Sequence, residues 1–143
     1  TNIYEDIHRV GESVGIDFAF EKIKRTPNTI DAHRLIKVAA KTAWDGLVVE
    51  RLFSAHFFDG ADIGDRNTLI EIARDAGLDV GRVAAELSSD LHFEVVRSEG
   101  AQARAFGIAG VPSFVFNNQY LLSGAQEPES FYPIFDLASL ARA

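Results

Sequence analysis

The chain has no cysteine and no methionine among its 143 residues. Without cysteine it can form neither a disulfide bond nor a thiolate metal site, so cysteine usage gives no indication of the redox compartment. The chain also begins without an initiator methionine, inside the amphipathic pattern TNIYEDIHRVGESVG. We therefore expect it to be a piece of a longer product.

Several other features are missing. No apolar run is long enough to cross a bilayer. The formal net charge of −7 comes from acidic and basic residues that are interspersed along the chain, so there is no basic stretch for nucleic acid. Glycine-rich phosphate loops and a serine nucleophile motif are lacking, and three of the histidines, His8, His56 and His92, lie far apart in the sequence. We expect no membrane partner, no nucleic-acid partner and no metal site.

Helical periodicity dominates the first three quarters of the sequence. It predicts helices, with glycine or aspartate at several of the expected ends, at 3–14, about 29–44, 47–58, 66–76, 79–90 and 91–106. The intervening residues 16–28 are expected to be irregular or extended, and Asp45–Gly46 to be a break. Trp44, Phe57 and Phe58 are expected in the core of this helical part.

The period then changes from helical to alternating. The stretch SFVFNNQYLLSG predicts two short strands joined at Asn117–Asn118, since asparagine tolerates the positive φ of a tight hairpin turn. Both faces of this hairpin are apolar, so both need cover. A terminal helix follows, and Pro133 should delay or bend it.

Three stretches carry a resemblance to a known family: RTPNTIDAHRLI, then ERLFSAHFFDGADIGD followed by LIEIARDAGLD, and AFGIAGVPSFVFNNQYLLSGAQEPESF. The chain resembles the DsbA-like thiol-disulfide oxidoreductases, most closely their FrnE-like branch. The resemblance implies an α/β, thioredoxin-like fold with a large helical insertion, here lacking its first β-α-β segment. Residues 1–106 would be the insertion, and residues 107–143 the cis-proline loop, hairpin and last helix of the thioredoxin fold.

The same resemblance implies the site. The Val111–Pro112 peptide bond would be cis and would present backbone to a disulfide-bearing protein or a small thiol substrate. The turn Ser123, Gly124, Ala125 and Gln126 would lie near the ligand. Asn28, Thr29 and His33 would neighbour the active site. Helix capping is nevertheless the favoured role for Asn28 and is open to Thr29, and we expect His33 to be a packed, hydrogen-bonded side chain.

The family's Cys-x-x-Cys pair is not in this chain. Exchange needs a thiolate nucleophile, so the chain is predicted to be inactive by itself. Two alternatives stay open. One is a relative of the glutathione-dependent 2-hydroxychromene-2-carboxylate isomerases or kappa-class glutathione transferases. The other is a non-catalytic binding module that forms a homodimer through the edge of the hairpin. The FrnE-like reading implies a cytoplasmic protein that needs no cofactor. In the glutathione-dependent alternative, glutathione would be the cofactor.

Overall fold

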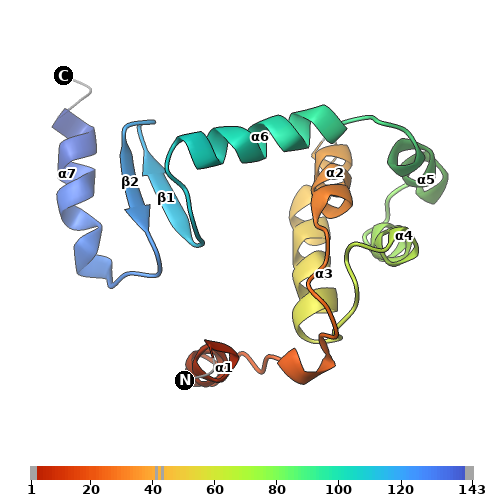
Figure 1. The fold of residues 1–143 in the computed structure, drawn as a ribbon, viewed down its shortest axis with the longest axis horizontal. Helices are drawn as coiled ribbons and strands as arrows, with labels where there is room; N and C mark the ends of the chain where they lie inside the picture. Colours follow the sequence, from red (N-terminus) through yellow and green to blue (C-terminus); the bar gives the residue numbers. More distant parts are fainter. Residues whose placement is uncertain (1–2, 41, 43, 141–143) are drawn as a thin grey trace. The chain divides into compact units, whose positions relative to one another are not determined.

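The fold is described from a computed structural model that covers residues 3–40, 42 and 44–140. Figure 1 shows these elements along the chain: α1 (Ile3–Ser13), η1 (Phe20–Lys22), α2 (Ile30–Ala39), α3 (Asp45–Phe57), α4 (Arg66–Asp75), α5 (Val80–Ser88), α6 (Phe93–Ala105), β1 (Ser113–Phe116), β2 (Tyr120–Ser123), η2 (Pro128–Ser130) and α7 (Tyr132–Leu140). They form two compact units, Thr1–Arg97 and Ser98–Ala143, which are described separately.

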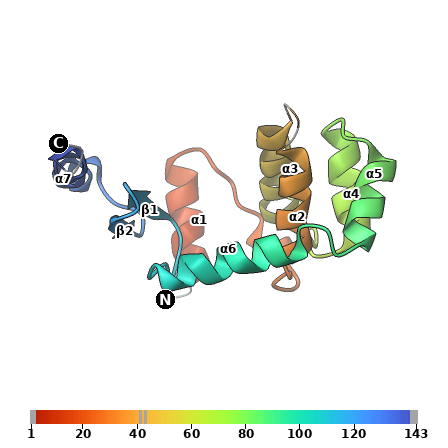
Figure 2. The ribbon, with the colours of Figure 1, turned by 90° about the horizontal axis from the view of Figure 1, so that it is seen from above.

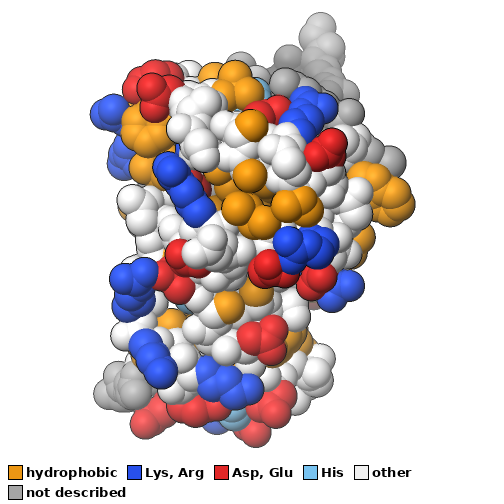
Figure 3. Space-filling model, turned by 90° about the vertical axis from the view of Figure 1, so that its right-hand side faces the viewer, with side chains coloured by type: hydrophobic (Ala, Val, Ile, Leu, Met, Phe, Trp, Pro, Cys, Tyr) orange, Lys and Arg blue, Asp and Glu red, His pale blue; other side chains and the backbone are white. Residues whose placement is uncertain are grey.

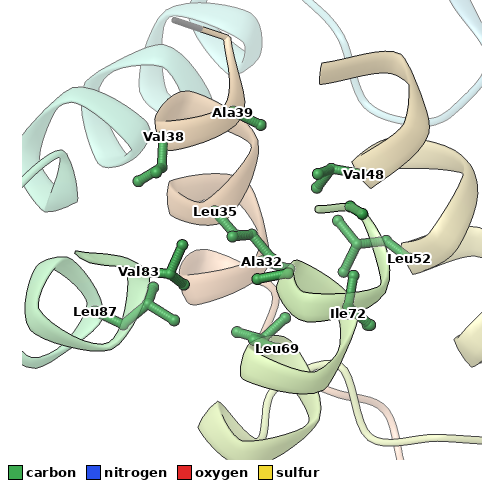
Figure 4. Close-up of a cluster of buried hydrophobic side chains, with 12 residues drawn as sticks. Ala32, Leu35, Val38, Ala39, Val48, Leu52, Leu69, Ile72, Val83 and Leu87 are labelled. Atoms are coloured by element: carbon green, nitrogen blue, oxygen red, sulfur yellow. The ribbon is translucent and has the colours of Figure 1, made fainter. Parts of the chain in front are cut away.

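The core of the first unit lies among α2, α3, α4 and α5. Leu35 on α2 is fully buried and lies between Leu69 of α4 and Val48 of α3, as Figure 4 shows. Helices α2 and α3 lie side by side in both ribbon views, as do α4 and α5 (Figure 2). These four helices bury a cluster made up of Ala32, Leu35, Val38, Ala39, Val48, Leu52, Leu69, Ile72, Ala73, Ala76, Val83 and Leu87. The helical unit therefore has a hydrophobic core of its own.

Local signals set the ends of α4 and α5. The side chains of Asp65 and Asp79 accept hydrogen bonds from the backbone N–H of Thr68 and Arg82, which satisfies free donors in the first turns. Gly77 follows α4 with φ +78°, a conformation that glycine adopts without cost. The predicted boundaries at Asp65 and Gly77 are confirmed.

The predicted boundary between α2 and α3 was wrong. Helix α2 ends at Ala39 instead of about residue 44, and Asp45–Gly46 begins α3 instead of breaking it. The hydroxyl of Thr42 donates to the Ala39 carbonyl and accepts from the Trp44 N–H, so it occupies the groups that a longer helix would use. Side-chain competition of this kind ends a helix without glycine or proline.

The segment after α1 is irregular, as expected, and carries an aromatic cluster. Phe18 and Phe20 contact the ring of Phe57, and Phe18 also stacks on Phe58. Phe58 is 40% exposed and Trp44 is 49% exposed, so neither belongs to the core, and that prediction was wrong. Phe57 is half-buried. The aromatic residues hold the segment 16–22 on the end of α3 rather than filling the interior.

The second unit contains the predicted hairpin. Strands β1 and β2 pair in antiparallel fashion, with Phe114 opposite Leu122 and Val115 opposite Leu121. Asn117 and Asn118 have φ of 50° and 55°, as the tight turn requires. This register places Phe114 and Leu122 on one face and Val115 and Leu121 on the other, so both faces are apolar, as predicted.

One face of the hairpin is covered by α7. The rings of Phe114 and Phe116 contact Phe131, and Phe116 also contacts Phe135. A 3-10 turn at Pro128–Ser130 precedes α7, which begins only at Tyr132, so the delay expected from Pro133 is confirmed. Among described residues 98–140, none is fully buried. This unit thus has contacts between its elements and lacks an interior.

The surface shows no large region of one charge on the face drawn in Figure 3, where Lys and Arg are interspersed with Asp and Glu. In the described part of the chain, no helix is both long and apolar enough to span a membrane.

Candidate functional site

The candidate site begins where α6 ends. Gly107 has φ +95°, and Ile108 N–H donates to the Ala103 carbonyl, which stops the helix. The chain then turns through Gly110, whose carbonyl accepts a hydrogen bond of 2.7 Å from the Ser113 hydroxyl. Within this turn the Val111–Pro112 peptide bond is cis. Val111 is 91% exposed, so the loop presents its backbone and one apolar side chain at the surface.

The two segments predicted to contact substrate meet at one end of the hairpin. Gly124 N–H donates to the Pro112 carbonyl at 2.8 Å, and Gly124 has φ +84°. The Gln126 side-chain amide donates to the Ser123 carbonyl at 2.9 Å, which fixes the turn. Ser123, Ala125 and Gln126 are exposed. The folding of the hairpin therefore brings 111–112 and 123–126 together.

The hairpin register shows which backbone groups are free. In an antiparallel pair, residues that exchange hydrogen bonds alternate with residues whose N–H and C=O point away from the partner strand. Because Gly124 bonds Pro112, the pair Ser113 and Ser123 and the pair Val115 and Leu121 are of the outward type. In the described chain the sheet has only these two strands. Ser113 and Val115 thus offer donors and acceptors along the outer edge of β1, next to Pro112.

This end of the hairpin is also uncharged. From residue 107 to residue 126 the sequence contains no Lys, Arg, Asp, Glu or His. The candidate contact segments can therefore bind a partner by backbone hydrogen bonds and apolar contact, and contribute no ion pair.

A second group of candidate residues lies in the helical unit. The Asn28 side chain accepts a hydrogen bond of 3.1 Å from Ile30 N–H, and Thr29 precedes α2 without a side-chain cap bond. Asn28 thus helps to begin α2, as its sequence position suggested. His33 is exposed, so the expectation of a packed, hydrogen-bonded histidine was wrong. It lies on the side of α2 that faces away from the core residues Ala32 and Leu35.

Sequence reasoning missed the most connected side chain near Asn28. Arg34 is 2% exposed. Its guanidinium donates to the backbone carbonyls of Ser89 at 2.6 Å, Glu86 at 2.7 Å and Leu91 at 2.8 Å. It also pairs with Asp31 at 2.7 Å. The sequence showed an arginine on an otherwise apolar helix face, and that was the one available signal.

Asp31 links Arg34 to a third helix. Its second carboxylate oxygen accepts from Arg66 Nε at 2.9 Å. Burial acts to raise the pKa of Asp31, but the hydrogen bonds from Arg34 and Arg66 outweigh it, so the pKa lies below its usual value. Asn28, Asp31 and Arg66 line a cavity of about 230 Å³. In its lining, Arg34 and Arg66 both pair with Asp31, which favours a structural role. No group of metal-ligating side chains occurs in the described residues.

Comparison with known proteins identifies the family. The profile of the DSBA-like thioredoxin domain matches residues 1–133, nearly the whole chain. The chain belongs to the DsbA-like thioredoxin family. No curated protein sequence matches it significantly. Among solved structures it is similar to a probable DsbA oxidoreductase of Streptomyces coelicolor, with 27% sequence identity and a TM-score of 0.80.

That similarity covers 97% of this chain and 60% of the Streptomyces protein, so this DsbA-like chain spans about three fifths of its relative's length. The expected fold class is confirmed as a thioredoxin-like DsbA fold, mostly helical, with a small antiparallel sheet and a C-terminal helix.

Proposed function

We propose that this chain is the substrate-contacting part of a FrnE-like dithiol-disulfide oxidoreductase. Residues 1–106 would be its helical insertion and residues 107–143 the C-terminal portion of its thioredoxin fold. The observation that carries the proposal is the exposed Val111–Pro112 loop beside the unpaired edge of β1. The branch implies a cytoplasmic protein, which fractionation of the source cells with antibody detection would test.

The reaction itself would use thiols outside this chain. A thiolate attacks one sulfur of the substrate disulfide, which breaks the S–S bond, releases the other substrate sulfur as a thiolate and forms a mixed disulfide. The second thiol, as its thiolate, then attacks the mixed disulfide, so that the two attacking sulfurs become a disulfide and the reduced substrate leaves. The chain has no cysteine, so its residues can position the substrate and cannot exchange with it. An extended substrate segment would pair with the outward backbone groups of Ser113 and Val115, beside Pro112.

The uncharged surroundings favour a disulfide-bearing peptide over glutathione. Glutathione carries two carboxylates and an ammonium group, and sites for such ligands ordinarily supply charged partners. The stretch 107–126 supplies none. An extended peptide with uncharged residues beside its cysteine needs only the backbone groups and the apolar side chains of Val111 and Val115.

Amide chemical shifts of the isotope-labelled chain would test the proposal directly. A short, uncharged peptide that carries an intermolecular disulfide should shift the amides of Val111, Ser113, Val115 and Gly124. Val115→Pro removes an outward N–H that the β1–β2 ladder does not use, and should weaken binding at least tenfold. Val115→Ala keeps that N–H and is the matched control.

The outcomes separate the readings. Absence of shifts, in a sample whose cross-strand contacts show a formed hairpin, would refute substrate contact by this loop. Shifts at Ser123–Gln126 with glutathione disulfide, and none with the peptide, would favour the glutathione-dependent reading. Equal binding by Val115→Pro and Val115→Ala would refute pairing on the edge of β1.

A further inference from the structure

The outer edge of β2 is a second free strand edge, on the side of the hairpin opposite the proposed substrate edge. Leu121 and Ser123 point their N–H and C=O groups away from β1, by the same register that leaves Ser113 and Val115 outward. The Ser123 carbonyl already accepts a hydrogen bond from the exposed Gln126 side-chain amide, and its second lone pair can accept another from a partner strand. Among described residues no other strand pairs there. Natural proteins commonly protect such an edge with charge, proline or a bulge. The sequence Tyr120–Ser123 contains no charge and no proline, and its pairing with β1 is regular.

We propose that the edge of β2 pairs with the same strand of a second copy of this chain, about a twofold axis. Two antiparallel copies of β2 can align Leu121 of one with Ser123 of the other, which places Leu122 opposite Leu122 of the second copy. This register joins four outward N–H groups to four outward carbonyls, two from each copy. Shifting it by two residues in either direction leaves only one residue of each strand in a bonded pair. The result is a four-stranded sheet.

The second unit favours such a partner for two reasons. Its described residues include no fully buried side chain, so the hairpin and α7 still expose apolar surface that a dimer would cover. Leu137 is 48% exposed and Leu140 is 73% exposed on α7, and Val115 is 41% exposed on the face of the sheet away from α7. In addition, the stretch 107–126 is uncharged, so no like charges face each other where the two strands would pair, although the whole chain is acidic.

The lack of cysteine makes the register directly measurable, because an introduced cysteine is the only thiol in each chain. Leu122→Cys would lie opposite its own copy in a non-hydrogen-bonded pair, where Cα atoms are about 4.5 Å apart and a disulfide can form. Leu121→Cys is the matched control. Its sulfur would face the second copy diagonally, at about 7–8 Å, beyond ordinary disulfide reach.

We expect Leu122→Cys to form covalent dimers under mild oxidation at least tenfold faster than Leu121→Cys at the same concentration. Sedimentation equilibrium of the unsubstituted chain should show a reversible monomer and dimer. Because a four-residue strand gives a small interface, the dissociation constant should be about 10–100 µM. Leu121→Pro removes one outward N–H from each copy and should raise this constant at least tenfold, whereas Leu121→Ala keeps the N–H.

Three results would overturn the proposal. The first is a monomeric mass up to millimolar concentration. The second is faster cross-linking by Phe114→Cys than by Leu122→Cys, which would assign the contact to the edge of β1. The third is an equal dissociation constant for Leu121→Pro and Leu121→Ala. If Leu121→Pro fails to fold, the cysteine pair decides alone. Because peptide binding is assigned to β1, failure of this dimer leaves the proposed function intact.

Discussion

Replacing Arg34 with methionine tests the assignment of this buried side chain to the architecture of the helical unit. Its guanidinium joins α2 to the end of α5 and to the chain that leads into α6, through the carbonyls of Glu86, Ser89 and Leu91. Methionine has a similar length and a flexible side chain, but no donors. The substitution therefore removes the hydrogen bonds while leaving most of the volume filled.

The magnitude follows from the acceptors. Glu86 O also accepts from Ser89 N–H, so it retains a partner. The carbonyls of Ser89 and Leu91 each lose a hydrogen bond from Arg34, and each loss costs about 1 kcal/mol of stability. The partly buried Asp31 loses one of the two cations that it pairs with, at a similar cost of about 1 kcal/mol. The sum is a loss of about 3 kcal/mol in the free energy of unfolding. Arg34→Lys should recover part of this, because it restores the charge without the planar group that reaches several carbonyls.

Urea unfolding followed by the fluorescence of Trp44, the one tryptophan of the chain, would measure the loss. Arg74→Met is the matched control, since Arg74 is a half-exposed arginine paired with Glu71 on the surface of α4. It should change the free energy of unfolding by less than about 0.5 kcal/mol. If Arg34→Met also costs less than about 1 kcal/mol, with an unchanged dependence on urea, the hydrogen-bond network does not hold the unit together and the reasoning fails.

Three further predictions concern pH, backbone and dynamics. The pKa of Asp31 is lowered in the folded chain. Its stabilising contribution is therefore complete above the unfolded pKa of about 3.9 and is lost as the pH falls through the folded pKa. The urea concentration at the midpoint of unfolding should accordingly depend less on pH, between about pH 2 and pH 5, in Asp31→Asn than in the unsubstituted chain. Gly60→Ala should destabilise the fold by more than about 1 kcal/mol, because φ is +66° and the added Cβ would lie 2.6 Å from the Lys22 carbonyl oxygen. Gly46→Ala lies in open space on α3 and should stabilise the fold by up to about 1 kcal/mol. Chemical unfolding of both variants would measure the two changes. Amide hydrogen exchange should be slowest in α2–α5 and faster throughout residues 98–140, and equal protection in the two units would contradict the absence of buried residues in the second.

Features with a local cause could be predicted from the sequence. Asp65, Asp79 and Gly77 act within one turn of their own helix, and Asn117–Asn118 set the hairpin without help from elsewhere. The strand register followed from that turn, because alternation then fixes which side chains share a face. The same holds for the late start of α7 at Tyr132, which places Pro133 in the first turn of the helix.

Features with a distant cause could not be predicted. The donors of Arg34 reach carbonyls more than fifty residues away in the sequence, and no local pattern marks such acceptors. Phe57 and Phe58 were assigned to the core by their apolar character alone, but the buried residues of α3 are Val48 and Leu52. His33 was expected to be packed, but it is exposed although the residues on both sides of it, Ala32 and Arg34, are buried.

The loop of the candidate site could be identified from its sequence motif, whereas the packing around it could not be predicted from the sequence. The geometry of 107–126 depends on glycine, proline and asparagine at fixed positions, and each of these acts on its own backbone. Its stability depends on cover for apolar side chains such as Val111 and Val115, and both are exposed in the described chain. The two requirements are thus separated along the chain: α2–α5 hold a buried core, while the loop and hairpin hold exposed, uncharged backbone. Substitutions on the outward positions 113, 115 and 121 should accordingly alter association more than unfolding, and substitutions at buried positions such as Leu35 and Leu69 should do the reverse.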